Sequence, residues 1–513
     1  MDSSKIKALV VFILGMCFAV YLGLAAATAQ KEVLAWVGGG FFLITCLLLG
    51  RHIWILIPAT LGMQGGLNFV PGSPAPWHLM TAAVGGVTLL RIATRQQRLQ
   101  IRWTGMETAL LLVALTILQT FLRNPTGLAI LGGDVTGGKP YFVFGIALIA
   151  FVLVGTADAD LRSWRWAVIA YIGFTFADAC IASASGLSPD FARAAIRVYS
   201  NVSFVASQSL DYSADTSNVR ITELGAFGSL LGPIACSFWR PIAALDLRKP
   251  WRAAIALFAV ISVLFGGFRS GAIRLFVNFV VGSLVRRKPL DVVVIGVLGA
   301  VIIAIVTFSV PTTSLPYSVQ RVLSIVPGAK VRTDIVKNAE DSNEFRFNMW
   351  KLALTTDRYI KNKLLGDGFQ YSAAEMRART GMMYGDYRSA GGMTTEEMFM
   401  ATGSYHGFHA ETIRFTGVIG LIAATAALIV FAVFASRCIR YYRDRPSWGF
   451  VLFICIPFLI HPYWHWLVFG EYRSQFPVLI ATAGMLKLLH QIICQESQVT
   501  TAENSLGAAK PRV

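Results

Sequence analysis

Long apolar runs recur along the chain and are separated by short polar segments rich in arginine and lysine. Most runs extend for about 18 to 24 residues, enough for a helix to cross a hydrocarbon core ~30 Å thick. The pattern therefore predicts an all-α polytopic membrane protein with about fourteen transmembrane helices. The predicted spans are 8–28, 33–50, 53–69, 77–93, 105–121, 141–157, 166–183, 222–239, 253–268, 271–285, 290–310, 412–435, 449–467 and 475–493.

Two of these spans have an alternative interpretation. The first begins at Ala8 after Lys5 and Lys7, as a signal peptide would. It is longer than a usual signal-peptide core and another apolar run follows directly, so a transmembrane helix is favoured. The third contains Pro58 and precedes the glycine-rich stretch QGGLNFVPGSP, which makes a broken or re-entrant helix the alternative.

Composition and charge agree with a membrane protein. Of the 513 residues, 55% are hydrophobic and 14% are charged, against roughly a quarter charged in soluble domains. A net charge of +17 would suggest nucleic-acid binding in a soluble protein, but most basic residues here lie in short loops. The positive-inside rule places such loops in the cytoplasm, so no nucleic-acid partner is predicted. The main basic clusters lie at residues 5–7, 51, 91–102, 162–165, 240–252, 286–288 and 437–445.

These clusters define the predicted organisation of the chain. With all of them inside, both termini are cytoplasmic, and the substantial outer loops are 122–140, 184–221 and 311–411. The last is far longer than a usual connection, which marks it as functional or as a small domain. The predicted units are helices 1–11 over 1–310, an outer loop domain over 311–411, helices 12–14 over 412–495, and a disordered cytoplasmic tail over 496–513.

Three arginines are candidate ligands for an anion at the outer face. Arg269 and Arg274 lie at the junction of two predicted spans, where a charge must reach the surface or find a partner. Arg346 lies in NEFRFNMWKLAL, whose apolar residues have helical spacing. Guanidinium groups match pyrophosphate oxygens and remain charged at any relevant pH. Snorkelling to lipid headgroups for Arg269, and solvation for Arg346, are the alternatives.

Titratable residues also stand before the long apolar run that begins at Thr412. His406, His409 and Glu411 occur in GSYHGFHAETIRFTGVIG. Histidine has an unperturbed pKa of about 6.5, which suits a general base near neutral pH. A histidine at this entrance is a candidate for taking a proton from a sugar hydroxyl, although interfacial histidines are more often structural.

Other polar residues are interpreted as structural. The seven cysteines lie in or beside apolar segments, so neither a disulfide framework nor a metal site is predicted. Asp158 and Asp160 are interpreted as a turn and helix cap. The stretch HPYWHW, residues 461–466, is interpreted as an aromatic belt at the outer interface. Four charged residues in or near spans are candidates for buried pairing or for a polar cavity: Glu107, Asp178, Glu223 and Lys487.

Four stretches between about residues 220 and 420 contain arginine, histidine and glycine motifs, and the order of these motifs is informative. They are NVRITELGAFGSLLGPIA, GGFRSGAI, EFRFNMWKLAL…LLGDGF, and His406-Gly407 followed by Gly417 and Gly420. Over about 220 to 470, their order and content resemble the O-antigen ligase and O-antigen polymerase superfamily. That resemblance implies a fold similar to the GT-C type of glycosyltransferase.

Individual positions carry the resemblance. His406 matches a family histidine that precedes a Gly-x-x-Gly within a helix, with Gly407 where the family usually has asparagine, serine or glutamine. GGFRSGAI resembles the family's Ser-Arg-Gly element, with Phe268 in place of the serine. The remaining matches are Arg220, Arg269, Arg346, Trp350, Gly366 and Gly368.

The resemblance implies a metal-independent, inverting glycosyltransferase of the bacterial inner membrane with its active site facing the periplasm. The donor would be an undecaprenyl-pyrophosphate-linked saccharide, and no cofactor would be needed. His406, Arg346 and Arg269 would be catalytic, and Arg220 and Trp350 would bind substrate. Arg274, His409 and Glu411 are not covered by the resemblance and are added as candidate substrate-binding residues, with His409 the alternative to His406. The bilayer and a glycan acceptor are implied partners, and a chain-length regulator is compatible with this role.

Four functions remain open at this point, one of which is a structural partner in polysaccharide assembly that has no catalytic role. A polymerase that joins lipid-linked repeat units of O-antigen or exopolysaccharide is favoured by the long outer loops. A ligase would transfer the glycan to lipid A-core or to a protein. A flippase or transporter for the same lipid-linked sugars is the alternative from another class, but transporters often carry paired repeats, and none is visible here.

Overall fold

The computed structural model describes residues 39–40, 45, 48–96, 102–125, 138–201, 224–246, 248–309, 314–326, 328–357, 359–369, 400, 403, 405–467 and 470–508. These residues form helices and no named β-strand, and an isolated bridge joins Leu67 to Tyr199. In chain order the elements are η1 (Gly50–Ile55), α3 (Leu56–Leu61), α4 (Pro76–Ala93), α5 (Gly105–Arg123), α6 (Lys139–Gly155), α7 (Leu161–Leu187), α8 (Pro189–Ala195), α10 (Gly225–Phe238), η4 (Pro241–Leu245), α11 (Pro250–Gly266), α12 (Arg269–Val285), α13 (Pro289–Ser309), α14 (Tyr317–Leu323), α15 (Thr333–Thr355), α18 (Phe408–Tyr441), α19 (Trp448–Leu467) and α20 (Tyr472–Ala508).

Five described helices are long and apolar enough to cross a membrane: α5, α7, α18, α19 and α20. They coincide with five of the predicted spans. Four shorter apolar helices, α6, α10, α11 and the first part of α13, coincide with four more. The structure thus confirms an all-helical chain with helices compatible with membrane insertion. The number fourteen stays a prediction, and span 8–28 lies outside the described residues.

Several predicted boundaries differ from the structure. The helix predicted over 53–69 ends at Leu61, because a turn at Gly62 and the following glycine-rich segment interrupt it. The helix that carries NEFRFNMWKLAL begins well before this stretch, at Thr333, and ends at Thr355. The tail from 496 was predicted to be disordered, whereas α20 continues to Ala508, since glutamate, glutamine, alanine and leucine favour helix and no proline follows Pro477 within α20.

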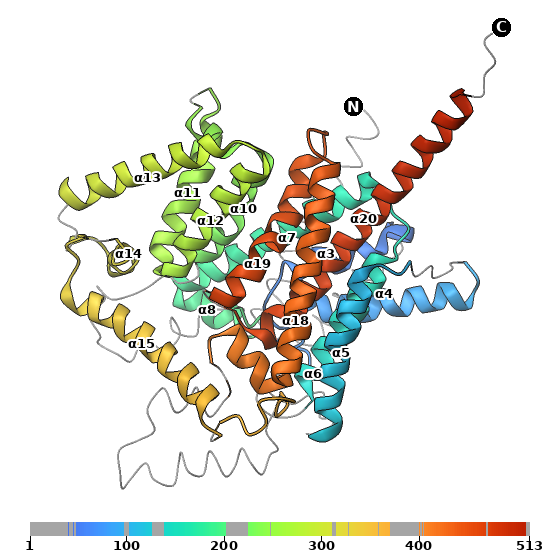
Figure 1. Cartoon of the computed structure of the whole chain (residues 1–513), viewed down its shortest axis with the longest axis horizontal. Helices are drawn as coiled ribbons and strands as arrows, with labels where there is room; N and C mark the ends of the chain where they lie inside the picture. Colours follow the sequence, from blue (N-terminus) through green and yellow to red (C-terminus); the bar gives the residue numbers. More distant parts are fainter. Residues whose placement is uncertain are drawn as a thin grey trace.

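The helices pack in two groups around separate apolar cores. The larger core is built mainly from α5, α6, α18, α19 and α20, with α3, α4 and α7 at its side. The smaller core joins α10, α11 and α12 through residues such as Phe227, Val263 and Leu275. Helix α10 packs on both α11 and α19 and so connects the groups, while α13 extends away from α11 and α12 (Figure 1).

Basic clusters gather where four helices begin or end. Arg286, which follows α12, donates hydrogen bonds to the carbonyl oxygens of Cys236 (2.6 Å) and Ser237 (2.7 Å) at the end of α10. Its guanidinium also lies 5.4 Å from the ring centroid of Trp448, where α19 begins. The preceding helix, α18, ends beside the basic cluster at 440–445. The basic ends of α10, α12, α18 and α19 therefore lie on one side of the molecule.

Three of the charged residues within predicted spans have partners: Glu107, Asp178 and Lys487. Lys487 of α20 is fully buried and its Nζ lies 2.5 Å from Oε1 of Glu107 in α5. Asp178 accepts hydrogen bonds from the Tyr199 hydroxyl (2.5 Å) and from the Asn201 side-chain amide (2.8 Å). Glu223 lies outside the described residues. A buried charge is costly unless it is paired, so these contacts explain how the charges are accommodated.

Candidate functional site

A cleft of about 390 Å³ lies at the junction of α10, α11, α12, α15, α19 and α20. This volume is within the range of ~300–1,000 Å³ that is typical of small-molecule sites. The cleft occupies the starts of α10, α12 and α20 and the end of α19, opposite to the basic helix ends. The polar and charged side chains of the lining are Ser229, Ser270, Arg274, Arg346, His461 and Gln475, and Trp464 adds an indole N–H donor.

Arg269 and Arg274 follow a tight turn between α11 and α12, and their side chains point in different directions. Gly267 ends α11 with φ of +69°, a left-handed conformation that glycine adopts freely, and α12 begins two residues later at Arg269. At 3.6 residues per turn, side chains five positions apart lie on different faces of a helix. Arg274 lines the cleft, whereas Arg269 donates hydrogen bonds to the Ala339 carbonyl oxygen (2.8 Å) and to Oδ1 of Asn343 (3.1 Å) in α15.

The charge of Arg346 acts on two other predicted site residues, Arg269 and His406. It lies on α15, is partly buried and lines the cleft together with Arg274. Burial lowers the pKa of Arg269, and the nearby charge of Arg346 lowers it further. The same charge contributes to lowering the pKa of His406. The structure therefore places Arg346 within electrostatic reach of both Arg269 and His406.

Among the residues that the structure describes, the two arginines that line the cleft have no counter-ion. Within the described ranges of the chain, neither Arg274 nor Arg346 has a hydrogen-bond or ion-pair partner. A guanidinium group remains protonated at neutral pH, and a charge held away from bulk water is costly unless it is paired. The cleft is therefore chemically suited to an anion that both arginines can contact.

His406 lies beside Glu471, near the entrance of the long helix α18. The residue adopts φ of +50°, which is uncommon for a residue with a side chain. Nδ1 of His406 is 4.0 Å from Oε1 of Glu471. Burial lowers the pKa of His406 below 6.5, Arg346 lowers it too, and Glu471 opposes both. The imidazole is therefore neutral at pH 7 and able to accept a proton.

Trp350 fixes the backbone around His406. Its indole Nε1 donates a hydrogen bond to the carbonyl oxygen of Tyr405 (2.8 Å), and its ring packs edge-on against His409. A Cβ atom on Gly407 would lie 2.6 Å from Trp350 Nε1, which is too close. This contact explains why position 407 is occupied by glycine.

Two other predicted ligands have neighbours within the protein. His409 lies between Trp350 and Trp466, with ring-centroid distances of 4.7 and 6.2 Å. Glu411 is 3% exposed, and its Oε2 accepts a hydrogen bond from the backbone of Tyr472 (2.9 Å), at the start of α20. These contacts position α18 and α20 at the cleft, and substrate binding by either residue stays a prediction. Arg220 lies outside the described residues.

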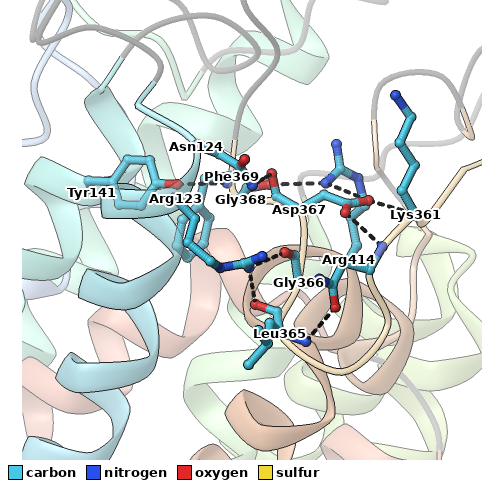
Figure 2. Close-up of polar contacts among 11 residues, drawn as sticks. Arg123, Asn124, Tyr141, Lys361, Leu365, Gly366, Asp367, Gly368, Phe369 and Arg414 are labelled. Carbon is cyan, nitrogen blue, oxygen red and sulfur yellow. Dashed lines mark hydrogen bonds and ion pairs between the residues drawn. The ribbon is translucent and has the colours of Figure 1, made fainter.

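The loop that carries Gly366 and Gly368 packs against α18 at Gly417, so the two glycine motifs of the sequence meet. Figure 2 shows this loop and its polar contacts. Gly417 interrupts α18 with φ of +77° and ψ of −179°, which leaves backbone groups of the helix unpaired. The 361–369 loop fills this kink: Asp367 donates its backbone N–H to the Arg414 carbonyl oxygen (2.8 Å), and Gly368 donates to Phe415 (3.1 Å).

The C-terminal end of α5 holds the outer side of the same loop (Figure 2). The Arg123 guanidinium donates to the carbonyl oxygens of Leu365 (2.8 Å) and Gly366 (2.6 Å), and the Asn124 side chain donates to Asp367 (3.1 Å). The Asp367 carboxylate in turn lies 3.5 Å from the Arg414 guanidinium. The loop is thus fixed to α5 and α18.

Sequence reasoning missed three residues of the cleft lining. His461, Trp464 and Gln475 face the cleft from α19 and α20. The stretch HPYWHW was interpreted only as an aromatic belt, because its composition suits a membrane interface. His461 and Trp464 are three residues apart and therefore lie on one face of a helix, whereas Tyr463 between them is exposed. This spacing would have indicated that the two side chains point in a common direction. By contrast, the assignment of Asp160 as a helix cap is confirmed, since its Oδ1 accepts from Ser163 N (2.9 Å).

Comparison of the chain with models of known protein families gives no match, and neither does comparison with curated protein sequences. Fold and cleft define the protein at the level of its class. It is an all-helical chain with five described helices able to cross a membrane and a cationic cleft at one end of the helix assembly.

Proposed function

We propose that the protein is an integral-membrane glycosyltransferase that polymerises undecaprenyl-pyrophosphate-linked oligosaccharide repeat units. One observation supports this proposal above the others. Two guanidinium cations, for which the described part of the chain supplies no counter-ion, line a cleft whose neighbourhood also contains a neutral histidine beside a carboxylate. A diphosphate fits the cations, because guanidinium groups bind phosphate oxygens through paired charge-assisted hydrogen bonds.

The proposed reaction uses these groups without a bound cofactor. The acceptor hydroxyl oxygen forms a bond to the anomeric carbon, and the bond from that carbon to the diphosphate oxygen breaks on the opposite face. The bonding electron pair leaves with the diphosphate, whose added charge Arg274 and Arg346 stabilise. The hydroxyl proton passes to His406, and Glu471 stabilises the imidazolium that forms.

Charge distribution supports an outward-facing site. The cleft and the basic clusters occupy opposite ends of α10, α12 and α19. The positive-inside rule assigns the basic ends to the cytoplasm. In a bacterial inner membrane the cleft would then face the periplasm, where a lipid-linked glycan is available after it has been flipped.

Polymerase activity is expected in detergent, where a transporter has no gradient or compartment to act on. The purified protein should elongate lipid-linked repeat units, and EDTA should reduce the rate by less than about twofold, because guanidinium groups supply the positive charge at the leaving group. Products are measured by gel electrophoresis of the released glycans. Replacing the lipid-linked acceptor by lipid A-core separates a polymerase from a ligase. Absence of glycan transfer to either acceptor, with lipid-linked sugar transport in proteoliposomes, would contradict the proposal and favour a flippase.

The rate should also depend on the protonation of His406. Because burial and Arg346 lower its pKa below 6.5, the rate should be constant near pH 7 and fall only in more acidic buffers, as the imidazole becomes protonated. The Glu471 charge raises this pKa, so Glu471→Gln should move the acidic fall to lower pH. The measurement is the initial rate between pH 5 and 8. An acidic fall that is unchanged in Glu471→Gln would exclude His406 as its source.

A further inference from the structure

The part of the cleft lining formed by α19 and α20 carries no net charge. It consists of His461, Trp464 and Gln475, whereas the arginines come from α12 and α15. Among the residues that the structure describes, none pairs with the buried Nδ1 of His461. The cleft thus combines a cationic part with a part that offers neutral hydrogen-bonding groups.

A stack of rings fixes the direction of His461. Its imidazole lies parallel to that of His465, with centroids 4.7 Å apart and an interplanar angle of 16°. His465 stacks in turn on Phe408, at 4.9 Å and 25°. Phe408 is two residues from His406, so the stack joins the proposed base to the cleft wall. A side chain held in this way loses little freedom when it binds a ligand.

The chemistry of this wall suits a sugar ring. A neutral imidazole and a carboxamide each offer both a donor and an acceptor, as a row of sugar hydroxyls requires. Trp464 is 7% exposed and adds an aromatic, largely apolar surface for the C–H groups of the ring. Diphosphate oxygens, by contrast, are matched by the arginines and gain little from these neutral groups.

We infer that His461, Trp464 and Gln475 form the subsite for the sugar that is attached to the diphosphate, and that His461 and Gln475 select it by its hydroxyl pattern. This inference rests on the proposed function. A cleft of about 390 Å³ has room for a diphosphate and an adjoining sugar but not for a long polyprenyl chain. The lipid tail then remains in the bilayer, and recognition of the donor is divided between cations for the diphosphate and neutral groups for the sugar.

The test compares two ligands of the full-length protein in detergent. One is a polyprenyl pyrophosphate, and the other is the same lipid carrying glucose, galactose or N-acetylglucosamine. Wild-type protein should bind at least one glycosylated lipid about tenfold more tightly than the bare lipid. His461→Ala and Gln475→Ala should each reduce that ratio about 3- to 10-fold, the effect of one lost hydrogen bond, with affinity for the bare lipid unchanged. Affinities are measured by microscale thermophoresis.

Matched controls keep the outcomes distinct. Tyr463→Phe changes the exposed neighbour of Trp464 and should leave both affinities unchanged. Unfolding temperatures of all variants are compared with that of the wild type. Equal affinity of the wild type for bare and glycosylated lipids would overturn the sugar subsite while the anion site remains. An equal loss for both lipids in His461→Ala would also overturn it, because the residue would then serve the diphosphate. Failure of the wild type to bind either lipid would contradict the proposed function itself.

Discussion

Replacing Arg346 by alanine should reduce glycan elongation on the order of 10²–10³-fold, as expected for the loss of one preorganised group at a site of developing charge. Arg346 lines the cleft, no described residue serves as its counter-ion, and its charge lowers the pKa values of both Arg269 and His406. Arg274→Ala should act in the same direction, because Arg274 lines the same cleft. Initial rates with saturating lipid-linked donor provide the measurement.

Two further variants define the cause of such a loss. Arg346→Lys retains a charge but not the planar fork, so it should restore only part of the activity. Lys351→Ala removes an exposed charge from the same helix and should leave the rate within about twofold of the wild type. Removing Arg346 also raises the pKa of His406, so rates are compared at pH 8, where the imidazole is neutral in both proteins. Full activity of Arg346→Ala at that pH would contradict the assigned role.

Replacing Gly417 by alanine should destabilise the protein by about 2–5 kcal/mol, combining backbone strain with steric overlap. The φ and ψ of Gly417 lie in a region that is essentially restricted to glycine. An added Cβ would lie 2.1 Å from the carbonyl oxygen of Leu364, in the loop that fills the kink. We expect a lower unfolding temperature in detergent and a smaller monodisperse fraction during size-exclusion chromatography.

Gly173→Ala is the matched control for this prediction. Gly173 lies within α7, and a Cβ there would meet no atom within 4 Å. Because alanine favours helix over glycine by about 1 kcal/mol, this variant should be as stable as the wild type or slightly more so. If Gly417→Ala unfolds at the same temperature as Gly173→Ala, the loop is not fixed by the kink in the way described.

The sequence predicted the positions of helices better than it predicted which side chains of different helices lie close together. Apolar runs located most of the described helices, because burial in a bilayer requires length and composition that single segments reveal. The cleft depends instead on the rotation of each helix about its axis. Arg269 and Arg274 are close in sequence, yet one contacts α15 and the other faces the cleft. A linear pattern does not contain that difference, since it is set by packing against elements distant in the chain.

The glycines give a second example. Gly366 and Gly417 stood out in the sequence as separate motifs, and the resemblance gave them no physical reason. The structure supplies one: the backbone of the loop enters a gap in α18, and either residue with a side chain would collide with the other segment. Two positions about fifty residues apart must therefore both lack a side chain, because the folded chain brings their backbones into contact.

Helix α15 offers a way to inhibit the protein from outside the cleft. It carries Arg346, accepts the hydrogen bonds of Arg269 through Ala339 and Asn343, and holds the backbone near His406 through Trp350. An antibody fragment that displaced α15 outward would remove the Arg346 guanidinium from the anion site. The same movement would break the hydrogen bonds that hold Arg269 and loosen the backbone that positions His406. The displaced helix would bind donor less tightly, and bound donor would in turn weaken the fragment, so inhibition should be strongest at low donor concentration.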